Sequence, residues 1–189
     1  AAMQENERRK DYWELVSLEN ATIREFYMAQ YDESAVVTLD ALSHIRLRTG
    51  MYIGRLGDGS HPEDGIYILF KEVIDNSIDE YIMGHGKSII VTCNYDTKTI
   101  SVRDYGRGIP LGKMLDCVQQ INTGAKYNDE VFQFSVGLNG VGLKAVNALS
   151  SHFLVRSVRE GKYVEASFCR GQLIQKQEGK SPDKNGTYI

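Results

Sequence analysis

The sequence has few cysteines, and their arrangement excludes two common uses of that residue. Only three occur in 189 residues, Cys93, Cys117 and Cys169, and no two of them form a CxxC pair. An odd number of widely spaced cysteines predicts neither a disulfide framework nor a zinc site. We therefore expect a reducing, cytoplasmic setting for the protein.

Long apolar runs and a strong charge of one sign are also absent. No run approaches the roughly 20 apolar residues that a membrane-spanning helix needs, and no signal peptide is visible. We expect no membrane partner on these grounds. The formal net charge of −3 argues against a surface dominated by contacts to nucleic acid. With 42% hydrophobic residues, the composition is that of one globular domain with a sizeable core.

Helical periodicity dominates the first part of the chain, and strand-like alternation dominates its end. Four helices are predicted. The first runs from near Thr38 to near Thr49, the second and third cover about 66–83 and 114–121, and the fourth runs from the glycine-rich stretch to Leu149. The predicted strands cover 88–95, 99–104, 153–159, 163–169 and 173–177, with a further strand beginning near Gly186. Helices before strands predict an α+β fold and not regular βαβ alternation.

The ends of the chain suggest how it is organised. Residues 1–30 are polar with scattered aromatics and are expected to form an N-terminal arm, while residues 31–189 form the domain. Thr123–Ser135 is expected to be an irregular segment inside that domain. Because a strand is only starting at the C-terminal end, we expect the chain to be a fragment of a longer protein.

The segment FKEVIDNSIDEYIM, residues 70–83, carries an unusual number of acidic side chains. Projected at about 100° per residue, one side of this helix is apolar, with Phe70, Val73, Ile74, Ile78 and Tyr81. The opposite arc is acidic or amide-bearing, with Glu72, Asp75, Asn76, Asp79 and Glu80. No Lys or Arg lies between residues 72 and 86, so nothing local is expected to neutralise the charges. An amide one turn from a carboxylate offers oxygen ligands that suit Mg²⁺; the alternative is a solvated outer face.

A second motif, SVRDYGRGIP, leads from a strand into a glycine-flanked turn. Asp104 falls at the end of the strand, where its carboxylate could accept a hydrogen bond from an exocyclic amine such as that of adenine. Arg107, between two glycines, could stack on a flat ring or pair with a carboxylate. The alternative interpretation is an ordinary turn at the end of a strand.

The third motif, GLNGVG at residues 137–142, precedes a helix. Free backbone N–H groups and the positive end of the helix dipole favour an anion at such a place. The stretch matches neither the P-loop pattern nor GxGxxG, so neither of the two common nucleotide folds is indicated. Lys126 is a candidate mobile phosphate contact, with a solvated lysine as the alternative. Together the three motifs predict a nucleotide site with Mg²⁺.

These motifs also resemble those of a known family. EVIDNSIDE, DYGRGIP, GLNGVGLKAVNALS and NGT resemble, in order and spacing, the four nucleotide-binding motifs of the GHKL ATPases. YDESAVVTLDALSHIRLRTGMYIG resembles the N-terminal segment of type IIA DNA topoisomerase ATPase subunits, and the match covers about residue 31 to the end. The resemblance implies a two-layer α/β sandwich, the Bergerat fold, with helices over a mixed, mostly antiparallel sheet. It also implies ATP and Mg²⁺ as ligands.

By position, the resemblance assigns a role to each motif. Glu72 would be the general base that activates water, and Asn76 would bind Mg²⁺. Asp104 would read the adenine amine, with Thr187 helping through a water, while Arg107 would lie against the adenine edge and pair with Glu80. The full set of implied nucleotide-binding residues is Tyr31, Asn76, Asp79, Glu80, Asp104, Gly106, Arg107, Gly108, Ile109, Lys126, Gly137, Leu138, Asn139, Gly140, Val141, Gly142, Leu143 and Thr187. Within this set, Gly137–Leu143 would form a lid over the triphosphate.

The resemblance further implies partners that act together with this domain. These are a second copy of the same subunit, which the Tyr31 arm would reach, a DNA-cleaving A-type subunit, and DNA bound through absent domains. The family's catalytic lysine comes from an absent transducer domain, so we expect this chain alone to bind ATP, hydrolyse it poorly and stay monomeric. Tyr105, Thr49 and Asn139 depart from the bacterial pattern and do not decide between the topoisomerase IV and gyrase groups, of which we favour the topoisomerase IV group. The alternatives are another GHKL ATPase, of chaperone or repair type, and a nucleotide-sensing module without hydrolysis.

Overall fold

The computed structural model describes residues 36–121, 123 and 140–189, and the chain divides into two compact units, Ala1–Leu39 and Asp40–Ile189. Of the first unit, residues 36–39 are described, and they are exposed and without regular secondary structure. All the helices and strands that the structure describes belong to the second unit. The predicted boundary at residue 30 lies outside the described residues, as does the predicted irregular segment 123–135 apart from Thr123.

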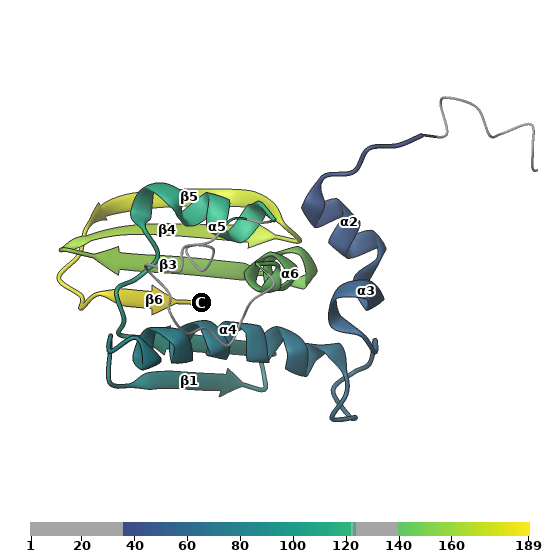
Figure 1. The fold of residues 1–189 in the computed structure, drawn as a ribbon, viewed down its shortest axis with the longest axis horizontal. Helices are drawn as coiled ribbons and strands as arrows, with labels where there is room; N and C mark the ends of the chain where they lie inside the picture. The colour runs from purple at the N-terminus through teal and green to yellow at the C-terminus, as the bar shows by residue number, and fades with distance from the viewer. Residues whose placement is uncertain (1–35, 122, 124–139) are drawn as a thin grey trace, which may run out of the picture. The chain divides into compact units, whose positions relative to one another are not determined.

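The second unit is built on a six-stranded sheet with the strand order β1-β2-β6-β3-β4-β5 (Figure 1). Its strands are β1 (Ile89–Asn94), β2 (Thr99–Asp104), β3 (Phe153–Arg159), β4 (Lys162–Cys169), β5 (Gln172–Lys180) and β6 (Gly186–Tyr188). Each pair of neighbouring strands that the structure describes is antiparallel. The last strand in the sequence, β6, therefore lies in the middle of the sheet, between β2 and β3.

Three tight turns join the strands that are neighbours in sequence. Lys98, Glu160 and Arg170 have φ of 52°, 51° and 50°, in the left-handed region. Two of these turns continue with a glycine that also has positive φ, Gly161 and Gly171. Such backbone matches the right-handed twist of paired strands. Pairing with β4, which has one register shift between Ser167 and Phe168, continues to the last residue of β5, so β5 is longer than its sequence pattern predicts.

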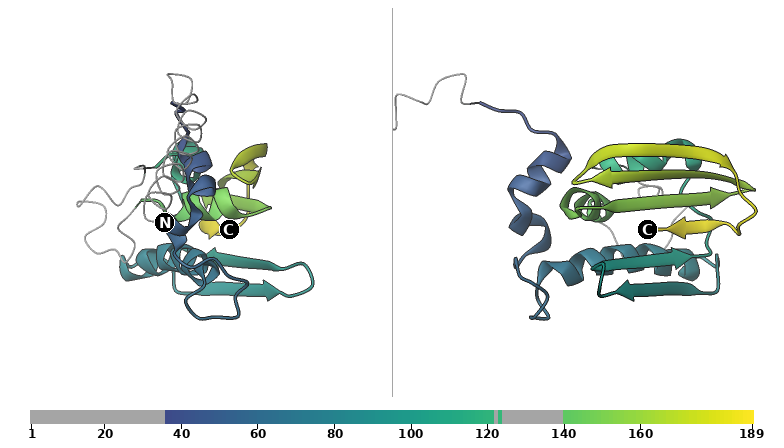
Figure 2. Two further views of the ribbon diagram at one scale, coloured as in Figure 1. Left: turned by 90° about the vertical axis from the view of Figure 1, so that its right-hand side faces the viewer. Right: turned by 180° about the vertical axis from the view of Figure 1, so that it is seen from behind.

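Helices cover one face of the sheet, and no described helix lies on the other face (Figures 1 and 2). The described helices are α2 (Ala41–Leu47), α3 (Thr49–Ile53), α4 (Gly65–Ile82), α5 (Met114–Gln119) and α6 (Gly142–Leu149), with a short 3₁₀ segment, η2 (Leu111–Lys113), before α5. The covering helices are α4, α5 and α6. No helix in the described part of the chain has both the length and the apolar character needed to span a membrane.

The helix predicted from near Thr38 to near Thr49 corresponds to α2, and the sequence patterns missed α3, which follows it directly. Asp40 caps α2, with its Oδ1 accepting hydrogen bonds from the N–H groups of Leu42 and Ser43 at 3.0 Å each. A side-chain cap of this kind satisfies backbone donors that a helix start leaves unpaired. The chain then breaks at Arg48, whose φ of −119° and ψ of 43° are not helical.

Two apolar clusters hold the helices in place. In the larger one, Met114 and Val118 of α5 pack against β3 and β4, with Phe168 fully buried. In the smaller one, α2 packs against α6 through Ile45 and Ala148. Burial of this apolar surface is the main stabilising contribution in both. The clusters place α6 beside α2 and α5.

Candidate functional site

Helix α4 buries several polar side chains. The predicted division of this helix into an apolar side and an acidic side therefore does not match its pattern of burial. Asp75, Ser77 and Asp79 are 7%, 5% and 0% exposed, whereas Tyr81 is 60% exposed. The prediction that Tyr81 lies on the covered side is therefore wrong. Ser77 has a partner on β2, where its hydroxyl donates to Asp104, and Asp75 has one on the same helix, Lys71. Such partners offset the cost of burying polar groups.

The acidic groups of α4 are also neutralised more than the sequence indicated. Lys71, one residue before the segment without basic residues, pairs with Asp75 across one helical turn. Arg107, from the loop after β2, pairs with Glu80. The expectation that nothing local neutralises these charges is therefore wrong for Asp75, whereas the partner of Glu80 is distant in sequence and is the one that the resemblance implied.

Asp104 ends β2 with its carboxylate turned inward, toward α4. Oδ1 accepts hydrogen bonds from the N–H of Gly106 at 2.9 Å and of Thr187 at 3.1 Å, and Oδ2 accepts one from Ser77 Oγ at 3.5 Å. The residue is 6% exposed. Burial raises the pKa of Asp104, and the nearby charge of Glu80 raises it further. The hydrogen bonds from the two backbone N–H groups lower this pKa, but they do not outweigh the burial. Asp104 is thus a buried acceptor at the junction of α4, β2 and β6.

Gly186 explains how β6 comes so close to Asp104. Its φ is 135°, and a Cβ at this position would lie 2.9 Å from the carbonyl carbon of Asp104. A side chain here would both strain the backbone and overlap the end of β2. The glycine therefore allows the next residue, Thr187, to reach the Asp104 carboxylate with its N–H. Thr187 itself is 9% exposed.

Arg107 and Glu80 form a bidentate ion pair beside Asp104. Nη2 of Arg107 lies 2.8 Å from Oε1 of Glu80, Nε lies 3.1 Å from Oε2, and the Arg107 N–H also donates to Oε2 at 2.8 Å. Burial by itself raises the pKa of Glu80, but the hydrogen bonds and charge of Arg107 outweigh it and lower the pKa. The same contact raises the pKa of Arg107. Gly106 has no room for a side chain, since its Cβ would lie 2.7 Å from Cβ of Glu80.

The loop from Gly106 to Pro110 is attached to β3. Ser157 Oγ donates a hydrogen bond to the Ile109 carbonyl at 2.7 Å, and Arg159 Nη1 donates to the Gly108 carbonyl at 3.3 Å. Gly108 has φ of 76°, a backbone conformation that other residues rarely adopt. The side chain of Ile109 packs against the larger apolar cluster. These contacts hold Arg107 in position against α4.

Two turns before Glu80, α4 meets the start of α6. Glu72 and Glu80 are eight positions apart on the helix, a rise of about 12 Å. Asn76 Nδ2 donates a hydrogen bond to the Glu72 carbonyl at 2.7 Å. Gly142 opens α6, and a Cβ built on it would lie 2.7 Å from Cδ of Glu72. The end of the glycine-rich stretch therefore lies against the Glu72 side chain.

The described part of the chain brings most of the sequence-predicted site residues together. Glu80, Asp104, Gly106, Arg107, Gly108, Ile109 and Thr187 surround one end of α4, and Glu72, Asn76 and Gly142 lie further along the same helix. Gly140, Val141 and Leu143 lie next to Gly142 in the chain, and Asp79 is fully buried on α4. Tyr31, Lys126, Gly137, Leu138 and Asn139 lie outside the described residues.

Sequence reasoning missed Ser77. Its hydroxyl faces Asp104 from the helix, yet a serine on a helix carries no sequence signal of such a contact. The available clue was its place, directly after Asn76 in the motif.

The metal-binding capacity of the site is limited to a few oxygen atoms. Among the described residues, no group of three or more His, Cys, Asp or Glu side chains could hold a metal ion. Asn76 and Glu72 supply amide and carboxylate oxygens, and Mg²⁺ is commonly held by one or two such protein ligands together with phosphate and water. The donor set therefore fits Mg²⁺ that arrives with a phosphate and does not fit a dedicated protein cage.

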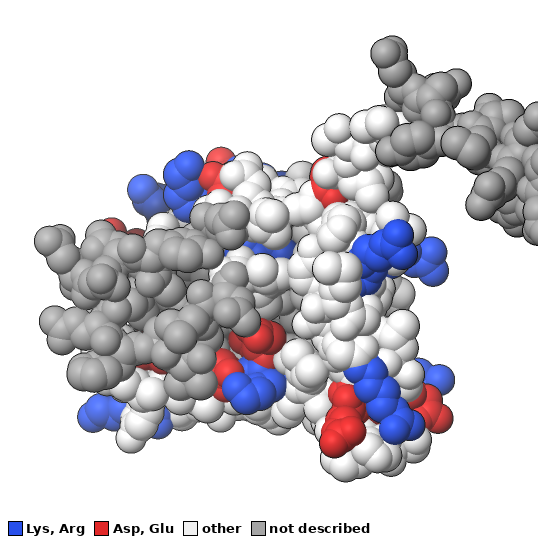
Figure 3. All heavy atoms as spheres, turned by 45° about the vertical axis from the view of Figure 1, so that its right-hand side comes forward, with Lys and Arg blue, Asp and Glu red and all other residues white. Residues whose placement is uncertain are grey.

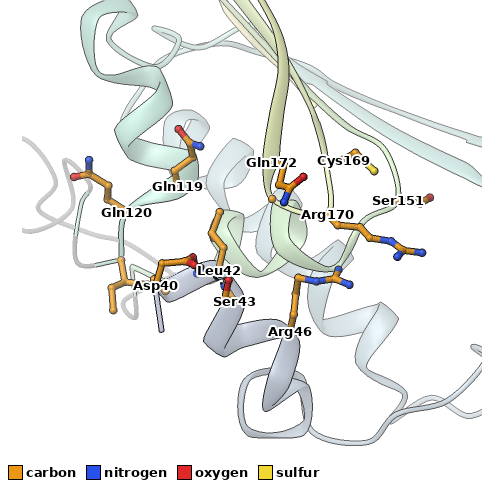
Figure 4. Close-up of a pocket in the computed structure, with 13 residues that line it drawn as sticks. Asp40, Leu42, Ser43, Arg46, Gln119, Gln120, Ser151, Cys169, Arg170 and Gln172 are labelled. Carbon is orange, nitrogen blue, oxygen red and sulfur yellow. Dashed lines mark hydrogen bonds between the residues drawn. The ribbon is translucent and has the colours of Figure 1, made fainter. Parts of the chain in front are cut away.

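A separate cavity of about 970 Å³ lies where the start of α2, the end of α5 and the β4–β5 turn meet (Figure 4). Its lining is mainly polar and includes Ser43, Arg46, Gln120, Arg170 and Gln172. None of the predicted site residues that the structure describes lines it. The cavity is therefore distinct from the cluster around Asp104.

The surface in Figure 3 has acidic and basic side chains interspersed among uncharged ones. On that face, the described residues form no broad area of a single sign. This distribution agrees with the small net charge of −3. On the face shown, the described residues therefore form no extended basic surface of the kind that binds nucleic acid.

Comparison with known proteins identifies the family. The family described as "Histidine kinase-, DNA gyrase B-, and HSP90-like ATPase" matches residues 61–179. The chain belongs to this ATPase family. Membership implies nucleotide binding, and it confirms both the resemblance seen in the motifs and the predicted α+β fold of the family.

Individual ATPase relatives agree with this assignment. The chain is 67% identical over 159 residues to the B subunit of DNA topoisomerase 4 of Borreliella burgdorferi, covering 84% of this chain and 26% of that protein. It is 38% identical over 170 residues to the B subunit of DNA gyrase of Thermus thermophilus, covering 84% of this chain and 26% of that protein. The chain thus spans about a quarter of the length of these relatives.

A solved ATPase domain has the same fold. The crystal structure of the 43K ATPase domain of Thermus thermophilus gyrase B in complex with an aminocoumarin matches with a TM-score of 0.61 and 32% identity. The match covers 79% of this chain and 38% of that one. An antiparallel sheet with helices on one face is therefore the architecture of this ATPase family member.

Proposed function

We propose that this chain is the ATP-binding and hydrolysing module of a bacterial type II DNA topoisomerase, from the topoisomerase IV B subunit rather than the gyrase B subunit. The observation that carries the proposal is the buried Asp104 carboxylate, placed beside the helix that bears Glu72 and Asn76. The higher identity to the topoisomerase 4 protein, 67% against 38% for the Thermus gyrase protein, supports the choice between the two groups.

In this proposal, Asp104 recognises the base of the nucleotide. Its carboxylate accepts a hydrogen bond from the adenine amine, and Thr187 contributes through a water. Arg107, held by its ion pair to Glu80, lies against the edge of the ring. A guanidinium fixed at both Nε and Nη2 keeps its plane, which suits contact with a flat base.

The phosphates lie at the other end of α4 in this proposal. Glu72 acts as the general base that activates water, and Asn76 would hold Mg²⁺ through its amide oxygen. When bound, Mg²⁺ would neutralise negative charge on the phosphates. Residues 137–143 and Lys126 cap the triphosphate. Phosphoryl transfer needs positioning and charge neutralisation more than covalent chemistry, so side chains in these places suffice.

The proposal extends to the whole subunit. A second copy of the subunit, a DNA-cleaving A-type subunit and DNA would be its partners, with Tyr31 in an arm that reaches the second copy. ATP binding would bring the two copies together and drive DNA strand passage. A topoisomerase acts on the bacterial chromosome, so we propose a cytoplasmic location. DNA contacts belong to other domains, as the mixed surface charge of the described face suggests.

Two alternatives remain within the same fold. Another GHKL ATPase, of chaperone or repair type, would share the nucleotide motifs but would not relax or decatenate DNA. A nucleotide-sensing module would bind ATP without turnover. Assays of ATP hydrolysis and of DNA topology on the full-length protein separate all three.

The experiment that tests the proposal is Glu72→Ala in the full-length protein. A general base contributes about 10²- to 10⁴-fold to a rate, so ATP turnover should fall at least about 100-fold. Affinity for a non-hydrolysable ATP analogue, measured by calorimetry with and without Mg²⁺, should change little. Glu63→Ala, at an exposed position before α4, is the matched control and should leave both unchanged. Turnover that survives Glu72→Ala would refute the base assignment.

A further inference from the structure

Gly142 occupies a position where backbone conformation does not require glycine. It is the first residue of α6, and its φ is not among the positive values that other glycines of the described chain adopt. Alanine is favoured over glycine inside helices by about 1 kcal/mol. Some other feature of the molecule must therefore account for a glycine here.

That feature is the Glu72 side chain. A Cβ at position 142 would lie 2.7 Å from Cδ of Glu72 and 3.0 Å from its Cβ, with its shortest approach to Oε2. Non-bonded carbon atoms prefer about 3.5–4.0 Å. Any residue larger than glycine would overlap the carboxylate. The first turn of α6 and the side chain of Glu72 can share this space only because Gly142 has no Cβ.

The overlap would move the side chain of Glu72 rather than its backbone. Its carbonyl accepts a hydrogen bond from Asn76 Nδ2 at 2.7 Å, within the 18-residue helix α4. The same helix is fixed by the Ser77 contact to Asp104 and by the Glu80–Arg107 ion pair. The carboxylate at the free end of the Glu72 side chain is the part with freedom to rotate away.

We propose that Gly142 is a positioning residue for Glu72. The inference rests on the proposed function, in which Glu72 is the general base. Gly142 leaves the carboxylate in the place from which it can take a proton from the attacking water. A displacement of about 1 Å at a catalytic group costs about 100-fold in rate. Gly142 therefore sets the rate of hydrolysis separately from any contact that residues 137–143 make with the phosphates.

The primary test is Gly142→Ala in the full-length protein, with Gly112→Ala as the matched control. A methyl group added at position 112 would meet no atom within 4 Å, and the backbone there has no positive φ, so this substitution should leave turnover unchanged. Gly142→Ala should lower ATP turnover by about 10- to 100-fold, while the Kd for a non-hydrolysable ATP analogue stays within about threefold. A crystal structure of Gly142→Ala should show the Glu72 carboxylate displaced, and its melting temperature should stay close to that of the wild type.

A double-mutant cycle with Glu72→Asp separates positioning from a structural role. Aspartate is shorter by one methylene, so it relieves the overlap at the end of the side chain and should lower turnover less in the Gly142→Ala background than in the wild type. If the effects of Gly142→Ala and Glu72→Asp on turnover simply multiply in the double variant, the inference is overturned. An unmoved Glu72 carboxylate in the crystal structure would also overturn it, and both results leave the proposed function intact. Turnover that survives Glu72→Ala would overturn the proposed function and the inference with it.

Discussion

The backbone N–H of Thr187 donates a hydrogen bond to Oδ1 of Asp104 at 3.1 Å, across 83 positions of sequence. The contact exists because β6 inserts between β2 and β3, and Arg103 pairs with Tyr188 in the same ladder. The last strand of the chain thus completes the surroundings of the carboxylate that we propose to read the base. Nucleotide recognition and closure of the sheet depend on the same backbone contact.

Asp104→Asn should weaken adenine nucleotide binding by about tenfold or more, because a hydrogen bond to a charged group contributes about 1.5–3 kcal/mol. The substitution keeps the size of the side chain and an oxygen for the Gly106 and Thr187 donors. Calorimetry with a non-hydrolysable ATP analogue measures the effect. Asp116→Asn is the control, since Asp116 lies on α5, pairs with Lys113 of η2 and makes none of the contacts described at Asp104. Equal affinities for wild type and Asp104→Asn would contradict the assignment.

The same substitution should change how stability depends on pH. The folded-state pKa of Asp104 is raised above 3.8, so the folded protein binds this proton more tightly than the unfolded chain. The free energy of unfolding therefore falls as pH rises from about 3.8 through the folded-state pKa of Asp104. Above that pKa the buried carboxylate is ionised and lowers the stability by its full amount. Asp104→Asn should be more stable than wild type at pH 7, with the gain lost at pH 3. Urea denaturation at several pH values measures this, and a gain that grows on acidification would refute it.

Glu80→Gln should have the opposite pH dependence. The pKa of Glu80 is lowered from 4.5, so its stabilising contribution is present above pH 4.5 and is lost as pH falls through the folded pKa. At pH 7 the substitution should cost about 1–3 kcal/mol, because it removes a charge-assisted bidentate pair. Denaturation curves at pH 7 and pH 3 test this. Glu178→Gln, whose pair with Lys176 is exposed, should have little effect at either pH.

Phe168→Ala should destabilise the protein by about 3–5 kcal/mol, the usual cost of removing a large buried aromatic ring. Phe168 is 0% exposed, and its ring lies 5.8 Å from that of Phe153 in a tilted arrangement. Chemical denaturation measures the change. Leu173→Ala on the neighbouring strand is the control, because Leu173 is 43% exposed and should lose much less. Similar losses for both variants would mean that the larger cluster is not the main core.

Local sequence patterns predicted most of the elements. The strand over residues 153–159 and that over 99–104 agree with β3 and β2, and the helix predicted over about 66–83 agrees with α4 to within one residue. These segments have strong periodicity, which reflects contacts of each residue with its near neighbours. The patterns missed α3, because Gly50 indicated the end of a helix and instead lies inside one.

Burial within α4 was less predictable. Asp79 and Tyr81 are two residues apart, yet the acid is fully buried and the aromatic is 60% exposed. Hydrophobicity alone predicts the reverse. Ser77 on the same helix shows what local hydrophobicity leaves out, because its hydroxyl contacts Asp104 of β2, which is 27 positions away in the sequence.

The sequence by itself determined the repeating patterns of helices and strands, the positions of the glycines and the order of the motifs, because each depends on residues close together in the chain. Tertiary structure alone decided that β6 lies between β2 and β3, that Ser77 faces Asp104, and that Gly142 lies against Glu72. These contacts join distant segments, and their free energy is gained only when the sheet and the helices pack together.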